Sequence, residues 1–122
     1  MSDFKVLQDI LLERFNQFRK WGEQNHPSFP AEVLNDPESW RKMEEWARRI
    51  CDSAAKQGVL TWMDILTEEI HEAYAAKDNA KLREELIQVA AVAVAWIDSL
   101  DRGGAGVDVS TTIISPLTST TL

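Results

Sequence analysis

The stretch that decides the fold is TWMDILTEEIHEAYAAKDNAKLREELIQVAAVAVAWIDSLDR, residues 61–102. It holds two acidic clusters, EEIHE at 68–72 and EELIQ at 84–88, separated by a short polar connection at 77–79. Residues three or four apart share one face of a helix, so each cluster presents its oxygen-bearing side chains together. A short connection folds the second helix back antiparallel to the first. The sequence therefore predicts a helical hairpin on which the two clusters meet.

Four oxygen-bearing side chains could converge where these two helices face each other. They are Glu69, Glu72, Glu85 and Gln88. Carboxylates held close together repel one another unless a proton or a cation lies between them. A hard divalent ion such as Mg2+ is the usual bridge for carboxylate oxygens. The pattern thus predicts a Mg2+ site, in which Mn2+ could substitute.

Start and stop signals delimit both helices of the hairpin. Thr61 followed by Asp64 resembles a capping box, which predicts a helix from Thr61 to about Lys77. Asp78 can cap the next helix, and the glycines from Gly103 onward stop it. Within this second helix, residues 89–96 (VAAVAVAW) are apolar on nearly every side. A helix with this pattern is buried all round, which in so small a protein predicts that another subunit covers part of it.

Two more helices are predicted before the hairpin. Helical spacing of apolar residues predicts one from residue 2 to Trp21, and Asp36-Pro37 starts another that ends at about Lys56. The apolar positions that recur in the first helix are Phe4, Leu7, Leu11, Phe15 and Phe18, and the expected buried stripe of the second is Met43, Ala47, Ile50 and Ala54. We expect an all-α, antiparallel four-helix bundle over residues 1–102, followed by a flexible tail over 103–122.

The loop after the first helix contains planar and hydrogen-bonding side chains. Trp21, Gln24, Asn25 and His26 lie close together in the sequence, just before two prolines. An aromatic ring beside such groups suits a nucleobase or another planar ligand. The alternative is an ordered loop that buries Trp21 and satisfies its own backbone.

Composition narrows the possible partners and compartments. The chain has 122 residues, enough for one domain, and a net charge of -7. Because it lacks a stripe rich in Lys and Arg, we expect no duplex nucleic acid partner. The single cysteine, Cys51, is expected to be a packed, reduced residue. The N-terminus does not resemble a signal peptide and no apolar run is long enough to span a bilayer, so we expect no membrane association and a cytoplasmic protein.

The acidic clusters resemble the signature of a known family. Residues 68–72 (EEIHE) match the first half of the signature of the MazG-like all-α nucleoside triphosphate pyrophosphohydrolases, and 85–88 (ELIQ) match the second half except that Gln88 replaces an aspartate. The flanking residues 61–66 and 82–93, and the loop KWGEQNHP at 20–27, resemble a MazG-like branch common in phages and actinobacteria. The resemblance covers most of residues 1–102.

This resemblance implies an activity and roles for individual residues. The family cleaves the α–β anhydride of a nucleotide with Mg2+, releasing a nucleoside monophosphate and pyrophosphate, and its small cores are completed as a homodimer or a dimer of dimers. Glu69, Glu72 and Glu85 would be metal ligands, Gln88 stands at the fourth ligand position, and Glu68 would be a ligand or would orient the attacking water. Residues of the branch's loop, Lys20, Trp21, Asn25 and His26, would bind the substrate. Lys81 and Arg83 could steer phosphate or serve as counterions to Glu84 and Glu85.

Two alternatives to this enzyme remain open at the level of sequence. Glu68 and His71 form one Glu-x-x-His element, which di-iron helical proteins use twice, but Gln88 stands where a second histidine would be required. The other alternative is a MazG-like module that binds a nucleotide or a protein without turnover. It follows from Gln88, because a neutral amide brings no charge to a metal site.

Overall fold

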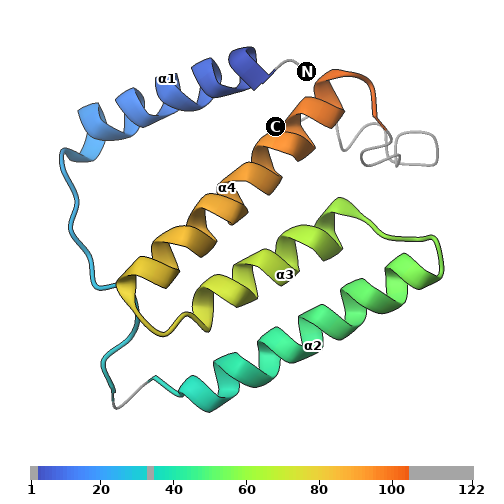
Figure 1. Ribbon diagram of the computed structural model, residues 1–122. Helices are drawn as coiled ribbons and strands as arrows, with labels where there is room; N and C mark the ends of the chain where they lie inside the picture. The colour runs from blue at the N-terminus through green and yellow to red at the C-terminus, as the bar shows by residue number, and fades with distance from the viewer. Residues whose placement is uncertain (1–2, 33–34, 105–122) are drawn as a thin grey trace, which may run out of the picture.

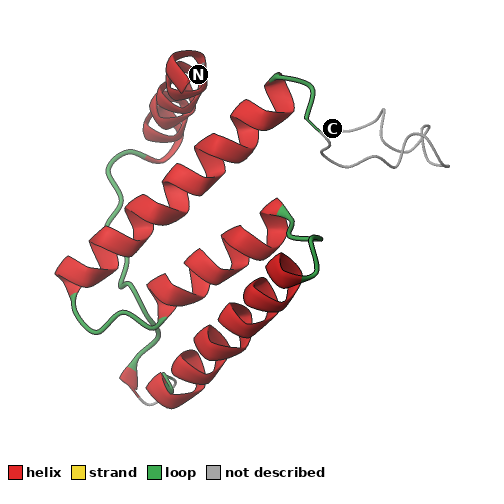
Figure 2. Cartoon of the chain, turned by 45° about the vertical axis from the view of Figure 1, so that its right-hand side comes forward, coloured by secondary structure: helices red, strands yellow, loops and turns green. Residues whose placement is uncertain are grey.

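The structure is a computed structural model that describes residues 3–32 and 35–104, and this part of the chain contains four helices and no strand (Figure 1, Figure 2). The helices are α1 (Asp3–Trp21), α2 (Pro37–Lys56), α3 (Trp62–Tyr74) and α4 (Asn79–Asp101). The predicted all-α class is confirmed. Residues 105–122, most of the predicted tail, lie outside the described part. No described helix has both the length and the apolar character needed to cross a bilayer.

Three helices, α2, α3 and α4, form an antiparallel row with α3 in the middle (Figure 1). In the described ranges α3 packs against both neighbours, whereas α2 and α4 do not touch. The buried side chains of α2 and α3 are small: Ala47, Cys51 and Ala73 are each no more than 9% exposed. Small side chains at a helix contact let the two axes come close together. Close packing of α2 on α3 therefore holds the hairpin of α3 and α4 against α2.

Helix α1 contacts only α4 among the described elements, and it diverges from the row (Figure 1, Figure 2). Its one buried side chain is Val6, which is 2% exposed. The predicted apolar stripe of α1 is present, and most of it is exposed in a single chain. Phe4 is 75% exposed, and Leu11, Phe15 and Phe18 are each 58% exposed. The reason is geometric: α1 meets α4 through the flank that carries Val6, and the stripe lies on another flank of the same helix.

The predicted starts of α2 and α3 agree with the structure. The Asp36 carboxylate accepts from the backbone N–H of Glu38 at 3.2 Å, with Pro37 as the first residue of α2. At α3, the Thr61 hydroxyl accepts from the Asp64 N–H at 3.1 Å while the Asp64 carboxylate accepts from the Thr61 N–H at 3.2 Å. This is the reciprocal capping box, with Asp in the position of Glu.

The end of α3 was predicted three residues too late, because α3 ends at Tyr74 and not at Lys77. The C-cap of α3 is Ala75, and the N-cap of the next helix is Asp78. Its carboxylate accepts from the Lys81 N–H at 2.8 Å, and its backbone is extended with φ -149° to do so. An N-cap residue needs this non-helical geometry, so the chain must leave the helical conformation before residue 78.

The buried face of α2 is also rotated from the predicted one. Ala47 is buried as expected, but Met43 and Ile50 are 40% and 38% exposed, and Cys51 is buried instead. Because α3 is the only helix of the described residues that packs on α2, one narrow face is covered and the larger side chains beside it remain exposed.

Candidate metal centre

Three carboxylates meet at the interface between α3 and α4. One oxygen from each of Glu69, Glu72 and Glu85 lies within 4.8 Å of the others. Glu69 and Glu72 are three residues apart on one face of α3, and Glu85 comes from the first half of α4. All three side chains are partly buried. Oxygen ligands from two rigid helices at this separation are compatible with one divalent ion between them.

Burial and mutual repulsion disfavour the charged form of this cluster. The pKa of Glu72 is raised to about 7, first by desolvation and then by the charges of Glu69, Glu85 and Glu68. Desolvation, followed by the charges of Glu68 and Glu85, also raises the pKa of Glu69. A cation bound by the three carboxylates would remove the same repulsion. The donor set therefore fits a hard divalent ion.

Two basic side chains flank the three carboxylates. Arg48, from α2, lies 3.8 Å from Glu72 and 3.9 Å from Glu68, and it bonds Glu44 at 3.0 Å. Lys81, from α4, lies 3.0 Å from Glu85. Both side chains are about half exposed, so their charges also face solvent. A negatively charged group that approaches the carboxylates meets a positive charge on either side.

Glu68 and Gln88 stand close to these ligands in the sequence, Glu68 on α3 and Gln88 on α4. On the side of α3 that meets α2, Glu68 lies 3.9 Å from Arg48 and near the Cys51 thiol. Cys51 is buried and free, which agrees with the predicted packed residue, and burial and Glu68 raise the pKa of its thiol to about 11. Gln88 is exposed on α4, almost one turn beyond Glu85. His71 has a buried Nδ1 without a hydrogen-bond partner and is not one of the clustered ligands.

The predicted substrate-binding residues are all exposed in this single chain. Trp21 is 55% exposed at the end of α1, with the Lys20 ammonium 4.9 Å from its ring centroid. Asn25 and His26 are exposed in the following loop, and Arg83 is exposed on α4. Since α1 contacts only α4 in the described ranges, nothing in one chain brings Trp21 to the carboxylates of α3. Their role in binding stays a prediction, whereas the alternative of a buried Trp21 is wrong.

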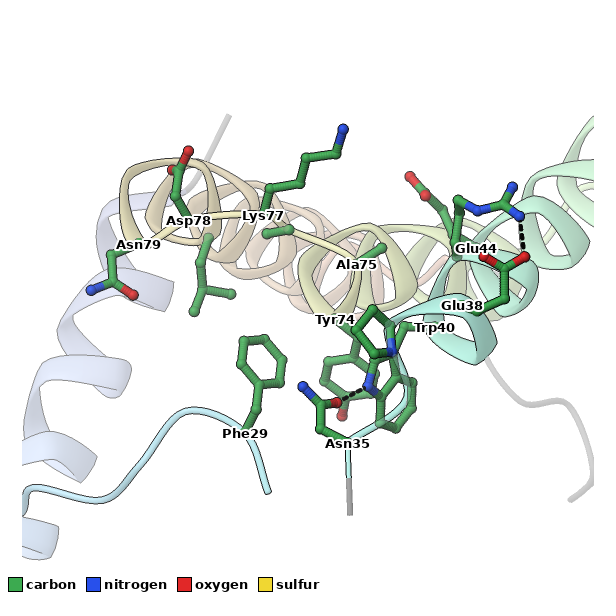
Figure 3. A pocket seen from close by; sticks show the side chains of 14 residues that line it. Phe29, Asn35, Glu38, Trp40, Glu44, Tyr74, Ala75, Lys77, Asp78 and Asn79 are labelled. Atoms are coloured by element: carbon green, nitrogen blue, oxygen red, sulfur yellow. Dashed lines mark hydrogen bonds and ion pairs between the residues drawn. The ribbon is translucent and has the colours of Figure 1, made fainter. Parts of the chain in front are cut away.

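A cavity of about 770 Å3, which was not predicted from the sequence, lies near the cluster (Figure 3). Its lining includes Phe29, Asn35, Trp40, Tyr74 and Leu82. A signal for it exists in the sequence, because antiparallel packing of α2 and α3 brings Trp40, early in α2, beside Tyr74, the last residue of α3. The aromatic character of both positions could have indicated a shared wall.

Comparisons with protein-family models, curated proteins and solved structures found no significant match. The fold and the site by themselves define the class as an all-α protein whose central helical hairpin carries three clustered carboxylates.

We predict that the metal-free protein becomes more stable as the pH falls from about 8 to about 5. The folded pKa of Glu72, about 7, exceeds its ordinary value of 4.5, so the folded state binds more protons in this range. The stabilisation is present at low pH and is lost as the pH rises through 7, by on the order of 2 kcal/mol. Urea unfolding at several pH values measures it. Glu72→Gln should make the free energy of unfolding depend less on pH. An equal pH dependence in that variant would show that Glu72 is not the group responsible.

We also predict that Mg2+ or Mn2+ stabilises the protein through these carboxylates. At a concentration of metal a hundredfold above its Kd, the melting temperature should rise by roughly 5–15 °C, and EDTA should reverse the rise. Glu85→Gln should remove most of this shift. Glu84→Gln is the matched control, because Glu84 is next to Glu85 in the sequence and carries the same charge, but its side chain is 72% exposed. Equal loss in both variants would show a nonspecific charge effect.

Proposed function

We propose that the protein is a Mg2+-dependent nucleoside triphosphate pyrophosphohydrolase, which converts a nucleotide and water to a nucleoside monophosphate and pyrophosphate. The observation that carries the proposal is the meeting of Glu69, Glu72 and Glu85 within 4.8 Å across the α3–α4 interface. The resemblance to the MazG-like family assigns metal binding to the same three residues. Sequence signature and geometry therefore support one site independently.

The residue types suit phosphoryl chemistry. This reaction requires little covalent work from the protein, and it depends on charge stabilisation and on placing water in line with the bond that breaks. A bound divalent ion supplies charge neutralisation on the phosphate oxygens. Glu69, Glu72 and Glu85 would hold it, while Arg48 and Lys81 would attract the remaining phosphate charge. Glu68, held by α3 beside the ligands, would accept a hydrogen bond from the attacking water and orient it.

Gln88 supports a second candidate, a module that binds a nucleotide without turnover. An amide oxygen can coordinate a metal but adds no negative charge, so a second ion would bind weakly at this position. One Mg2+ keeps several waters and needs only one or two carboxylates, so the three glutamates supply enough ligands for it without Gln88. We therefore favour the enzyme with one tightly bound ion.

We predict pyrophosphate release from at least one member of a panel of ribo- and deoxynucleoside triphosphates with Mg2+. Glu69→Gln should lower kcat/KM by at least about 100-fold, because loss of a ligand charge removes several kcal/mol of transition-state stabilisation. Glu84→Gln, on the exposed side of α4, should retain activity. A folded wild-type protein that leaves the whole panel intact with Mg2+ and with Mn2+ would exclude the enzyme and favour the binding module.

We infer that a second copy of the chain covers the apolar stripe of α1. The stripe is much larger than a scattered exposed residue, since Phe4, Leu11, Phe15 and Phe18 are all at least 58% exposed along one flank. On α4, Leu86 and Ile87 are each 50% exposed, so the chain carries two apolar surfaces that could pack together. Self-complementary surfaces close most simply in a twofold dimer. A homodimer, or a dimer of dimers, would complete the core that one chain leaves open.

We predict that Leu11→Glu converts this oligomer to a monomer at micromolar concentration. The new carboxylate would be buried without a partner in the interface, which typically costs several kcal/mol. Asn16→Glu is the matched control, since Asn16 is an exposed polar residue on another flank of α1 and acquires the same charge. Light scattering measures the mass of each variant. A monomeric wild-type protein would overturn the inference.

A further inference from the structure

The cavity near the carboxylates has an aromatic wall built from three separate segments. Phe29 comes from the linker before α2, Trp40 from α2 and Tyr74 from the end of α3. The Trp40 and Tyr74 rings pack edge to face, with centroids 5.6 Å apart and planes at 66°. Figure 3 shows Phe29 across from this pair, with Asn35 between them. A volume of about 770 Å3 lies within the range of small-molecule sites.

Asn35 gives this cavity a defined hydrogen-bonding character. The Trp40 Nε1–H donates to the Asn35 Oδ1 at 2.5 Å. An indole nitrogen is only a donor, so its partner must be the amide oxygen, and the orientation of the amide follows from this. In Figure 3 the amide nitrogen points away from Trp40, toward the side of Phe29. Asn35 therefore offers N–H groups to a ligand, whereas its oxygen is already engaged.

The cavity adjoins the three carboxylates along two routes. On α4, Leu82 lines the cavity and Glu85 follows it three residues later, less than one helical turn away. Across the row, Glu44 lines the cavity and bonds Arg48 at 3.0 Å, and Arg48 lies 3.8 Å from Glu72. A molecule with a planar ring at one end and a phosphate chain at the other could occupy both places.

We propose that this cavity binds the base of the nucleotide, with Phe29, Trp40 and Tyr74 contacting the ring and the Asn35 amide donating to an oxo group on its edge. The assignment rests on the proposed function for the phosphate end of the ligand. It also predicts a preference for a base with an oxo group at that edge. A base with an amino group there is disfavoured, because the amino group and the Asn35 amide N–H are both donors. The loop residues Trp21, Asn25 and His26 have no part in this contact.

The test compares ligands that share a phosphate but differ at one base position. Uridine monophosphate, cytidine monophosphate and inorganic pyrophosphate, each with Mg2+, are titrated into the full chain by calorimetry. The wild-type protein should bind the uridine nucleotide more tightly than the cytidine nucleotide. Tyr74→Ala should weaken the binding of both nucleotides about 10-fold, because a contact with the base is lost. The affinity for pyrophosphate should not change. Asn35→Asp keeps an acceptor for Trp40 but removes the donor, so it should abolish the preference for uridine.

Controls separate this inference from the proposed function. Trp46→Ala removes a side chain that is 54% exposed elsewhere on α2, and it should leave all three affinities unchanged. Unchanged nucleotide affinity in folded Tyr74→Ala, a stronger loss in Trp21→Ala, or tighter binding of the cytidine nucleotide by the wild type would each overturn the assignment. These affinities are measured without turnover. The affinities therefore show whether the base binds in this cavity even if the protein hydrolyses no triphosphate. A lack of hydrolysis would exclude only the proposed enzymatic activity.

Discussion

The repulsion among Glu69, Glu72 and Glu85 is the constraint on which the rest of the structure depends. Three partly buried carboxylates within 4.8 Å are unfavourable in their charged forms, and desolvation, followed by the charges of the neighbouring carboxylates, raises the pKa of Glu72 to about 7. The helices hold the cluster together nevertheless. Caps at Thr61 and Asp78 set where α3 and α4 begin, and a connection of four residues between them imposes the antiparallel hairpin. A divalent ion would convert this local cost into binding free energy.

The open arrangement of the helices has a related consequence. Because α2, α3 and α4 form a row, one side of the α3–α4 interface stays accessible to a ligand, and the cavity beside Trp40 and Tyr74 opens at the end of the same row. The same arrangement leaves the stripe of α1 exposed. A closed bundle would bury more apolar surface but would also cover the carboxylates. Association of two chains would allow both a larger core and an accessible site.

The charges around the cluster fit the binding of an anionic ligand despite a net charge of -7. Arg48 and Lys81 each pair with a carboxylate at the site, so the local field changes sign over a short distance. Once a cation offsets the carboxylates, these two side chains and the ion would together favour phosphate. The apolar cavity next to them would suit the opposite, uncharged end of the same molecule.

The sequence by itself determined the local features: four helices, the Asp36, Thr61 and Asp78 caps, and the helical faces that carry Glu69, Glu72 and Glu85. These follow from interactions between residues a few positions apart, which sequence spacing records directly. Only the tertiary structure decided which faces are buried. The stripe of α1 and Met43 on α2 are exposed because each helix has too few neighbours, and spacing cannot tell how many neighbours a helix has. The cavity of Phe29, Asn35, Trp40 and Tyr74 likewise arises from segments distant in sequence, so its existence depended on how the helices pack.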